Sequence, residues 1–120
     1  MEFYLGTHIP SWLSRFEIPM FVSRTQLYKR KTLPKSIASW CLDSGAFSEI
    51  ATHGKWMMQE LEYVSFVNRC AEEIGLLQWA APMDWMCEPD MLLKTGFTIR
   101  EHQKRTTENV VNLRELTNVP

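Results

Sequence analysis

The amino-acid sequence predicts an α/β fold in which parallel strands alternate with helices. Two observations support this prediction: the candidate strands are apolar on both faces of the pleat, and helix-like periods of apolar residues lie between and after them. Strands that are apolar on both faces are typical of parallel sheets, because helices cover both sides of such a sheet. Alternation of strands and helices is typical of βαβ units. The length of 120 residues is that of one domain.

Four short apolar runs are the candidate strands. Each run ends at a polar residue or at a turn signal. The runs cover residues 3–6, 20–23, 39–42 and 77–83. At the end of the chain, residues 118–120 have the pattern of a turn that leads into another strand.

Two longer segments have the periodicity of amphipathic helices. In the first, apolar residues recur at three- and four-residue spacing, and Gly75 follows as a natural C-cap. The second begins at Thr98 with Glu101 three residues later, which is the pattern of a capping box, and fades at Leu116. The expected buried stripes are Leu61, Val64, Val67, Ala71 and Ile74 in the first helix, and Ile99, Thr106, Val110 and Leu113 in the second.

The composition excludes several classes of protein. Hydrophobic residues make up 45% of the chain and charged residues 22%, which excludes a disordered, collagen-like or low-complexity chain. No apolar run approaches the roughly 18 residues that span a bilayer, and no signal-peptide pattern is visible. Three cysteines without C-x-x-C spacing predict neither a metal site nor a disulfide framework, so a reducing cytoplasm is the expected compartment.

The net charge of −1 gives no overall basic field, but the charges are placed unevenly. Residues 24–35 carry five basic side chains and no acidic one. Such a run is typical of a solvated surface, and it also offers candidate contacts to nucleic-acid phosphates. The candidate phosphate contacts are Arg24, Lys29, Arg30 and Lys31.

Polar side chains follow every candidate strand at the point where the strand ends. The carboxyl ends of parallel strands share one edge of a sheet, and ligands bind there in α/β folds. The sequence therefore predicts a binding site at this edge. The residues are Thr7 and His8, then Ser23 and Arg24, then Asp43 and Ser44, then Asp84, Cys87 and Glu88.

Two of these strand ends carry compact motifs. In residues 43–47, Asp43 is followed by Gly45, which permits a tight turn or the close approach of a flat ligand, and by Phe47, which offers a stacking face. The alternative is an ordinary turn with a core phenylalanine.

In the second motif, Asp84 lies among apolar side chains, where a carboxylate needs hydrogen-bond donors. The N1–H and the amino group of a purine would supply two donors, with Trp85 beside the ring. The alternative is a buried carboxylate that accepts from local amides.

The same motifs resemble those of known enzymes. Residues 43–47, D-S-G-A-F, resemble the D-S-G-G-F signature of the queuine/archaeosine tRNA-guanine transglycosylases, and residues 84–88 are similar to their F-D-E-C segment. The fuller resemblance is to the deazapurine DNA-modification transglycosylase-like proteins of phages and bacteria. It covers essentially all 120 residues, including 3–8, 21–24, 42–49, 53–56, 79–89, 94–96 and 101–106.

The resemblance implies the N-terminal half of a TIM-type (β/α)8 barrel that replaces guanine in DNA, or in tRNA, with a 7-deazaguanine base. Asp43 would be the catalytic carboxylate beside the exchanged base, and Asp84 would accept hydrogen bonds from the guanine-like edge. Cys87 would line the base pocket. These residues are not expected to bind a cofactor. Further candidate contacts to the base are Ser44, Gly45, Phe47, Trp85 and His8.

The resemblance also has departures. Ala46 replaces the second glycine, and Cys87 follows Asp84 by three residues rather than two. In the family the nucleophilic aspartate and the zinc cysteines lie in the later half of a barrel, which typically needs about 250 residues.

Residues 1–120 are therefore expected to form a partial barrel domain that is inactive alone, as a fragment or split-gene product. A C-terminal half-barrel chain or a second copy would be its partner, and Trp40, Trp79 and Trp85 would pack against such neighbours. Two alternatives stay open. One is a small non-catalytic α/β module that binds a purine or nucleic acid, and the other is a remnant that binds no ligand.

Overall fold

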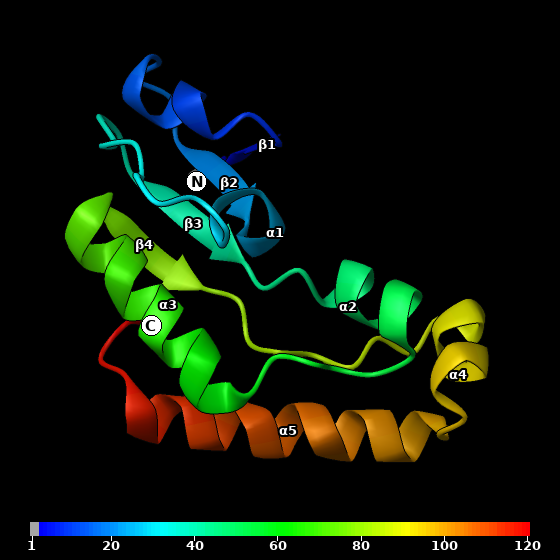
Figure 1. Ribbon diagram of the computed structural model, residues 1–120. Coiled ribbons are helices and arrows are strands. Elements are labelled where there is room, and N and C mark those ends of the chain that lie inside the picture. The colour runs from blue at the N-terminus through cyan, green and yellow to red at the C-terminus, as the bar shows by residue number, and fades with distance from the viewer. Residues whose placement is uncertain (1–2) are drawn as a thin grey trace.

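Four parallel strands form the sheet that positions the candidate site. The computed structural model describes residues 3–120. The strands lie side by side in chain order, β1-β2-β3-β4, and every neighbouring pair is parallel (Figure 1). Their bounds are Leu5–Thr7, Met20–Ser23, Trp40–Asp43 and Leu77–Ala80. The predicted α/β fold with a parallel sheet is confirmed, and each predicted strand overlaps an observed one.

Both long helices occur where they were predicted, as α3 (Glu60–Glu73) and α5 (Ile99–Leu116). The shorter helical segments were not predicted, because each has at most eight residues and is too short for an extended apolar stripe. His53 is the last residue of one of them. The shorter segments are the 3-10 helix η1 (Pro10–Ser14), α1 (Arg24–Leu27), α2 (Ala46–His53) and α4 (Pro89–Thr95).

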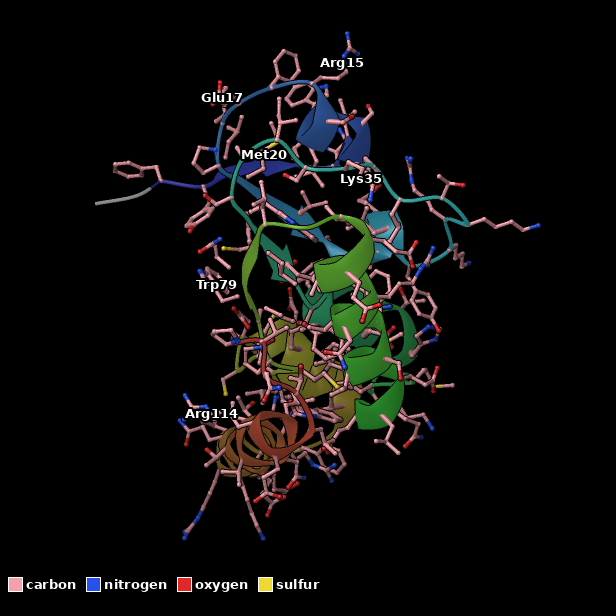
Figure 2. All side chains as sticks on the ribbon, turned by 90° about the vertical axis from the view of Figure 1, so that its left-hand side faces the viewer. Arg15, Glu17, Met20, Lys35, Trp79 and Arg114 are labelled. Atoms are coloured by element: carbon pink, nitrogen blue, oxygen red, sulfur yellow. The ribbon has the colours of Figure 1, made fainter. Side chains whose placement is uncertain are left out.

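The two faces of the sheet differ in what covers them. Helix α3 packs on one face, whereas Trp79 lies on the side of the sheet away from α3 (Figure 2). On this second face the Trp79 ring contacts Phe21 at 5.5 Å and Tyr4 at 6.1 Å between ring centroids. Trp79 is 38% exposed. Trp79 therefore packs against aromatic rings of this chain, and its packing against residues outside the chain stays a prediction.

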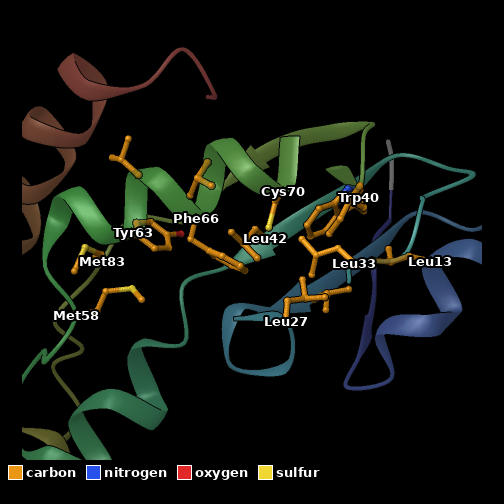
Figure 3. Packing of buried hydrophobic residues seen from close by; sticks show 14 of the residues in the cluster. Leu13, Leu27, Leu33, Trp40, Leu42, Met58, Tyr63, Phe66, Cys70 and Met83 are labelled. Carbon is orange, nitrogen blue, oxygen red and sulfur yellow. The ribbon is translucent and has the colours of Figure 1, made fainter. Parts of the chain in front are cut away.

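The hydrophobic core lies between the sheet and α3 (Figure 3). Trp40 was expected to face neighbours outside the chain, and this expectation is wrong. Its ring is fully buried in the core, and its Nε1 donates a hydrogen bond to Gly75 O at 2.8 Å. The chain itself therefore hides one of its largest side chains. Core side chains from the sheet and α3 include Met20, Val22, Leu42, Tyr63, Phe66 and Val67. Leu13 from η1 and Leu33 from the loop after α1 close one end.

The predicted buried stripe of α3 is right in part. Val64, Val67 and Ile74 are buried, whereas Leu61 is 66% exposed. Tyr63, Phe66 and Cys70 are also buried and were missed, because aromatic and thiol side chains count weakly in a search for aliphatic spacing. Burial raises the pKa of the Cys70 thiol to about 12, which keeps it protonated in neutral solution.

The last residues of the chain extend the sheet at the edge strand β4. Ala80 N donates a hydrogen bond to Pro120 O at 2.9 Å, so the carboxyl-terminal segment lies beside β4 (Figure 1). In the part of the chain that the structure describes, no helix is long and apolar enough to cross a membrane.

Candidate functional site

The turn that follows β3 places Asp43 at the carboxyl edge of the sheet. Asp43 is the last residue of β3 and lies opposite Ser23, the last residue of β2. Two residues later, Gly45 has φ +81°, in the left-handed region that glycine adopts without strain. A Cβ at Gly45 would also lie 2.9 Å from Thr25 Cγ2. The glycine of the motif is thus required both by its backbone conformation and by the packing of α1 against the turn.

Gly45→Ala tests this requirement. We expect a loss of about 1–3 kcal/mol in the free energy of unfolding, because the left-handed backbone strains a side chain and the new methyl group meets Thr25. Gly96→Ala is the matched control, because Gly96 has a similar φ of +77° with no atom within 4 Å of its Cβ position. Urea denaturation of both variants separates crowding from backbone strain. Equal losses would show that the close approach at Gly45 carries no energy.

A buried arginine holds the same turn in place. Arg24 is 5% exposed; its Nε donates to Ser44 O at 2.7 Å and its Nη2 pairs with Glu49 Oε1 at 2.9 Å. The second carboxylate oxygen of Glu49 accepts from Met57 N at 3.0 Å. Arg24 was predicted to contact phosphate, and the structure instead gives it a carboxylate partner inside the protein. We correct its role to that of a clamp that fixes the Asp43–Gly45 turn.

Asp84 lies on an extended strap, residues 81–88, that follows β4. Helix α5 holds the strap through polar side chains: Thr106 Oγ1 accepts from Trp85 N at 2.8 Å, and Asn109 Oδ1 accepts from Met83 N at 3.0 Å. The buried His102 ring bonds Met86 O through Nδ1 at 2.7 Å. The predicted apolar stripe of α5 is therefore only partly right: Leu113 is buried, but Ile99 is exposed, and polar residues take the inward positions.

Two further contacts fix the strap next to Asp84 itself. Trp56 Nε1 donates to Asp84 O at 2.9 Å, and the Tyr63 hydroxyl donates to Ala81 O. Burial is the main reason that the pKa of Tyr63 lies well above its usual range, and the nearby Asp43 carboxylate adds to it. Helix α3, helix α5 and the loop before α3 thus all hold the segment that carries Asp84.

The carboxylates of Asp43 and Asp84 share one electrostatic environment. Burial raises the pKa of Asp84 above its usual range, and the negative charges of Asp43 and Glu88 raise it further. The backbone amide of Asp84 and the hydroxyl of Ser44 oppose this rise. Ser44 is fully buried, and its Oγ makes no hydrogen bond of standard geometry within residues 3–120. The carboxylates of Asp43 and Asp84 and the buried hydroxyl of Ser44 therefore gather where a ligand with several N–H donors could bind.

The structure distributes the other predicted base contacts more widely. Phe47 is 65% exposed on α2, close in sequence to the turn, and His8 is exposed after β1. Trp85 is half-buried and packs against Arg105, whose guanidinium carbon lies 4.9 Å from the ring centroid. The Cys87 thiol points toward backbone carbonyls, with Sγ 3.8 Å from Trp85 O and 3.9 Å from Ile99 O. These positions leave Asp43, Ser44, Gly45 and Asp84 as the compact part of the site.

The predicted phosphate contacts do not form a single cluster. Lys29 follows α1 at the carboxyl edge of the sheet, whereas the carbonyl groups of Arg30 and Lys31 accept hydrogen bonds from Arg69 Nη2 on α3. All three side chains are exposed. Thr106 was expected in the buried stripe of α5, and its hydroxyl holds the strap. Asn109 and the Arg24–Glu49 pair were missed, because no sequence pattern distinguishes a buried polar residue from a surface one.

Comparison with known proteins adds one decisive observation. The family described as DpdA, DeoxyPurine in DNA protein A, matches residues 1–119. The chain belongs to this family. The match is consistent with the resemblance to DNA deazapurine-modification proteins; the relation to the tRNA-guanine transglycosylases stays a prediction. No curated protein and no solved structure matches the chain.

Proposed function

We propose that the chain carries the base-recognising part of a DNA base-exchange site, in which guanine is replaced by a 7-deazaguanine base. Asp84 accepts hydrogen bonds from the N1–H and the 2-amino group of the base. Asp43 lies beside the same base, where it can exchange a proton with a ring nitrogen. The observation that supports this proposal most is that Asp43, at the carboxyl edge of the sheet, and Asp84, on the strap, share one electrostatic environment with the buried Ser44 hydroxyl.

The charge of the pair fits a base with several donors. Two carboxylates near each other repel, and donors from a bound base relieve that repulsion by charge-assisted hydrogen bonds. Guanine and 7-deazaguanine bases present N1–H and an amino group side by side, whereas adenine lacks N1–H and has its amino group at a different carbon. The site therefore favours guanine-like bases over adenine.

We further propose that the sheet is part of a (β/α)8 barrel and that this chain alone does not catalyse exchange. In such a barrel, parallel strands follow one another around the sheet in chain order, as β1 to β4 do here. In a doubly wound sheet, the strand order instead reverses at a switch point. The uncovered face with Phe21 and Trp79 supports the same idea, because parallel sheets are covered on both faces. Further strands, from a C-terminal half-barrel or a second copy, would then face Asp43 across the barrel.

Isothermal titration calorimetry tests the recognition step with the full chain. We expect guanine and 7-cyano-7-deazaguanine to bind and adenine to give no heat of binding. Equal binding of adenine, or no binding of either guanine-like base, would contradict base recognition by these residues.

The competing function is a small binding module that needs no further strands. Purine binding by a monodisperse, folded monomer would favour it, because a barrel half with an open face should associate or require a partner. Sedimentation velocity of the chain supplies this measurement. Incorporation of labelled base into DNA by the chain alone would overturn the proposal that it is inactive.

A further inference from the structure

A polar groove lies beside the candidate site, between α1, α2 and the start of α3. Its volume is about 420 Å³. Helices α1 and α2 both follow strand ends, so the groove opens at the same edge of the sheet as Asp43 (Figure 1). No part of the base-recognition proposal uses this groove.

The two walls of the groove carry matched polar side chains. Thr25 and Lys29 come from α1 and the turn after it, and Ser48 and Thr52 come from α2. Each pair is four residues apart, which places its members on one side of a helical turn. All four side chains are exposed. The Thr25 hydroxyl also lies 2.9 Å from Ser23 Oγ, and either oxygen can be the donor. Hydroxyl and ammonium groups that line one groove are donors suited to phosphate oxygens.

The charged groups of the groove are two cations, Arg24 and Lys29, and two carboxylates, Glu49 and Glu62. The carboxylate of Glu49 is paired with Arg24, and that of Glu62 accepts from the Tyr28 hydroxyl at 3.4 Å and from Gln59 N at 3.3 Å. Lys29 makes no ion pair within residues 3–120. His53 at the end of α2 adds a ring nitrogen to the same groove. Lys29 is therefore the cation of the groove that can pair with an anion, and the Glu62 carboxylate, which makes no ion pair within residues 3–120, opposes it.

The groove and the candidate site share a wall. Arg24 and Thr25 line the groove, and the same two side chains lie within 3.2 Å of the Cβ position at Gly45. Arg24 also holds Ser44 O. A ligand in the groove would thus be separated from the Asp43–Gly45 turn by a single layer of side chains.

From this arrangement we propose that the groove between α1 and α2 binds a backbone phosphate of the DNA strand whose base is presented at Asp43. Lys29 supplies the charge, and Thr25, Ser48 and Thr52 donate hydrogen bonds. This inference rests on the proposed function for its choice of polymer. The groove is a positioning site: contacts to phosphate fix where the strand lies without reading its sequence.

Fluorescence anisotropy of a labelled single-stranded oligonucleotide tests the proposal. We expect Lys29→Glu to weaken binding about tenfold and to reduce the slope of log K against log salt by about 1. The matched control is Lys35→Glu. Lys35 belongs to the same basic run but lies toward the amino ends of the strands, beside Ser36, whose N–H donates to Ile74 O at the end of α3 (Figure 2). The Lys35→Glu variant should bind the oligonucleotide with an affinity within about twofold of the wild-type value.

A second variant removes a donor without changing charge. Thr52→Val keeps the shape of the side chain and should weaken oligonucleotide binding about threefold if its hydroxyl contacts phosphate. Equal effects of Lys29→Glu and Lys35→Glu, together with no effect of Thr52→Val, would show that binding depends only on the overall charge of the chain. This result would contradict a phosphate site in the groove. Absence of oligonucleotide binding would overturn it as well. Displacement of the oligonucleotide by inorganic phosphate at constant ionic strength would assign the groove to free phosphate instead.

The two proposals, base recognition at Asp84 and phosphate binding in the groove, can be tested separately with these variants. Lys29→Glu should leave the calorimetric binding of free 7-cyano-7-deazaguanine unchanged, because that base has no phosphate. Asp84→Asn should weaken the free base and leave the salt dependence of oligonucleotide binding as it is. If the wild-type chain does not bind the free base, but Lys29→Glu still weakens oligonucleotide binding, the proposed function is contradicted and the phosphate site in the groove is still supported.

Discussion

Arg24→Ala is expected to lower the free energy of unfolding by about 3–5 kcal/mol, because it breaks a buried ion pair and leaves Glu49 without its counter-charge. The Arg24 and Glu49 side chains are 6% and 12% exposed, so water cannot replace the lost partner fully. The hydrogen bond to Ser44 O is lost in the same variant. A loss of this size corresponds to a melting temperature lower by roughly 10 °C or more for a domain of this length.

Two controls make the result specific. Arg24→Met with Glu49→Leu removes both charges and fills part of the space, so it should recover most of the loss that Arg24→Ala causes. Lys104→Ala breaks the exposed Lys104–Glu108 pair, whose charged atoms lie 3.9 Å apart, and should cost less than about 1 kcal/mol. Thermal and urea denaturation measure all three. An Arg24→Ala loss no larger than that of Lys104→Ala would show that the clamp does not stabilise the turn.

The strand ends could be predicted because they depend on local chemistry. Asp43 follows three buried residues of β3, and Gly45 is a residue that a left-handed turn requires. An apolar run that ends at an acidic residue can be recognised from the sequence alone. The parallel sheet then brings the ends of β2 and β3 to one edge, with Ser23 opposite Asp43. The position of Asp43 at that edge therefore followed from the pattern.

The supports of the site could not be predicted, because they depend on contacts between distant segments. Thr106 and Asn109 lie on the inward side of α5 and bond to the strap at Trp85 and Met83, more than twenty residues earlier. Hydrophobic periodicity placed Thr106 and Leu113 on the inner side of α5, but it does not show that Asn109 is buried or which backbone group it bonds. Arg24 shows the same limit: a basic run does not reveal which of its members has a buried carboxylate partner.

Asp84→Asn is expected to weaken the binding of guanine-like bases about 10- to 150-fold, the value of one or two hydrogen bonds to a charged group. The amide keeps the shape of the carboxylate but replaces one acceptor with a donor, which faces the N–H groups of the base. Asp90→Asn, at an exposed position in the first turn of α4, is the control for the same chemical change and should not alter base binding. Calorimetry with 7-cyano-7-deazaguanine gives both values.

The stability of Asp84→Asn should change in the opposite direction to its binding. Burial first, and then the charges of Asp43 and Glu88, raise the pKa of Asp84 in the folded chain above its unfolded value of 3.8. The folded state therefore holds a proton that the unfolded state has lost, and stability falls as pH rises from the unfolded to the folded pKa. Asparagine cannot ionise, so its advantage over aspartate should grow through that window and stay constant above it. Urea denaturation from about pH 3 to about pH 8 measures this difference. A variant that loses stability and base binding together would instead identify Asp84 as a structural carboxylate, because a group retained for ligand recognition need not stabilise the fold that holds it.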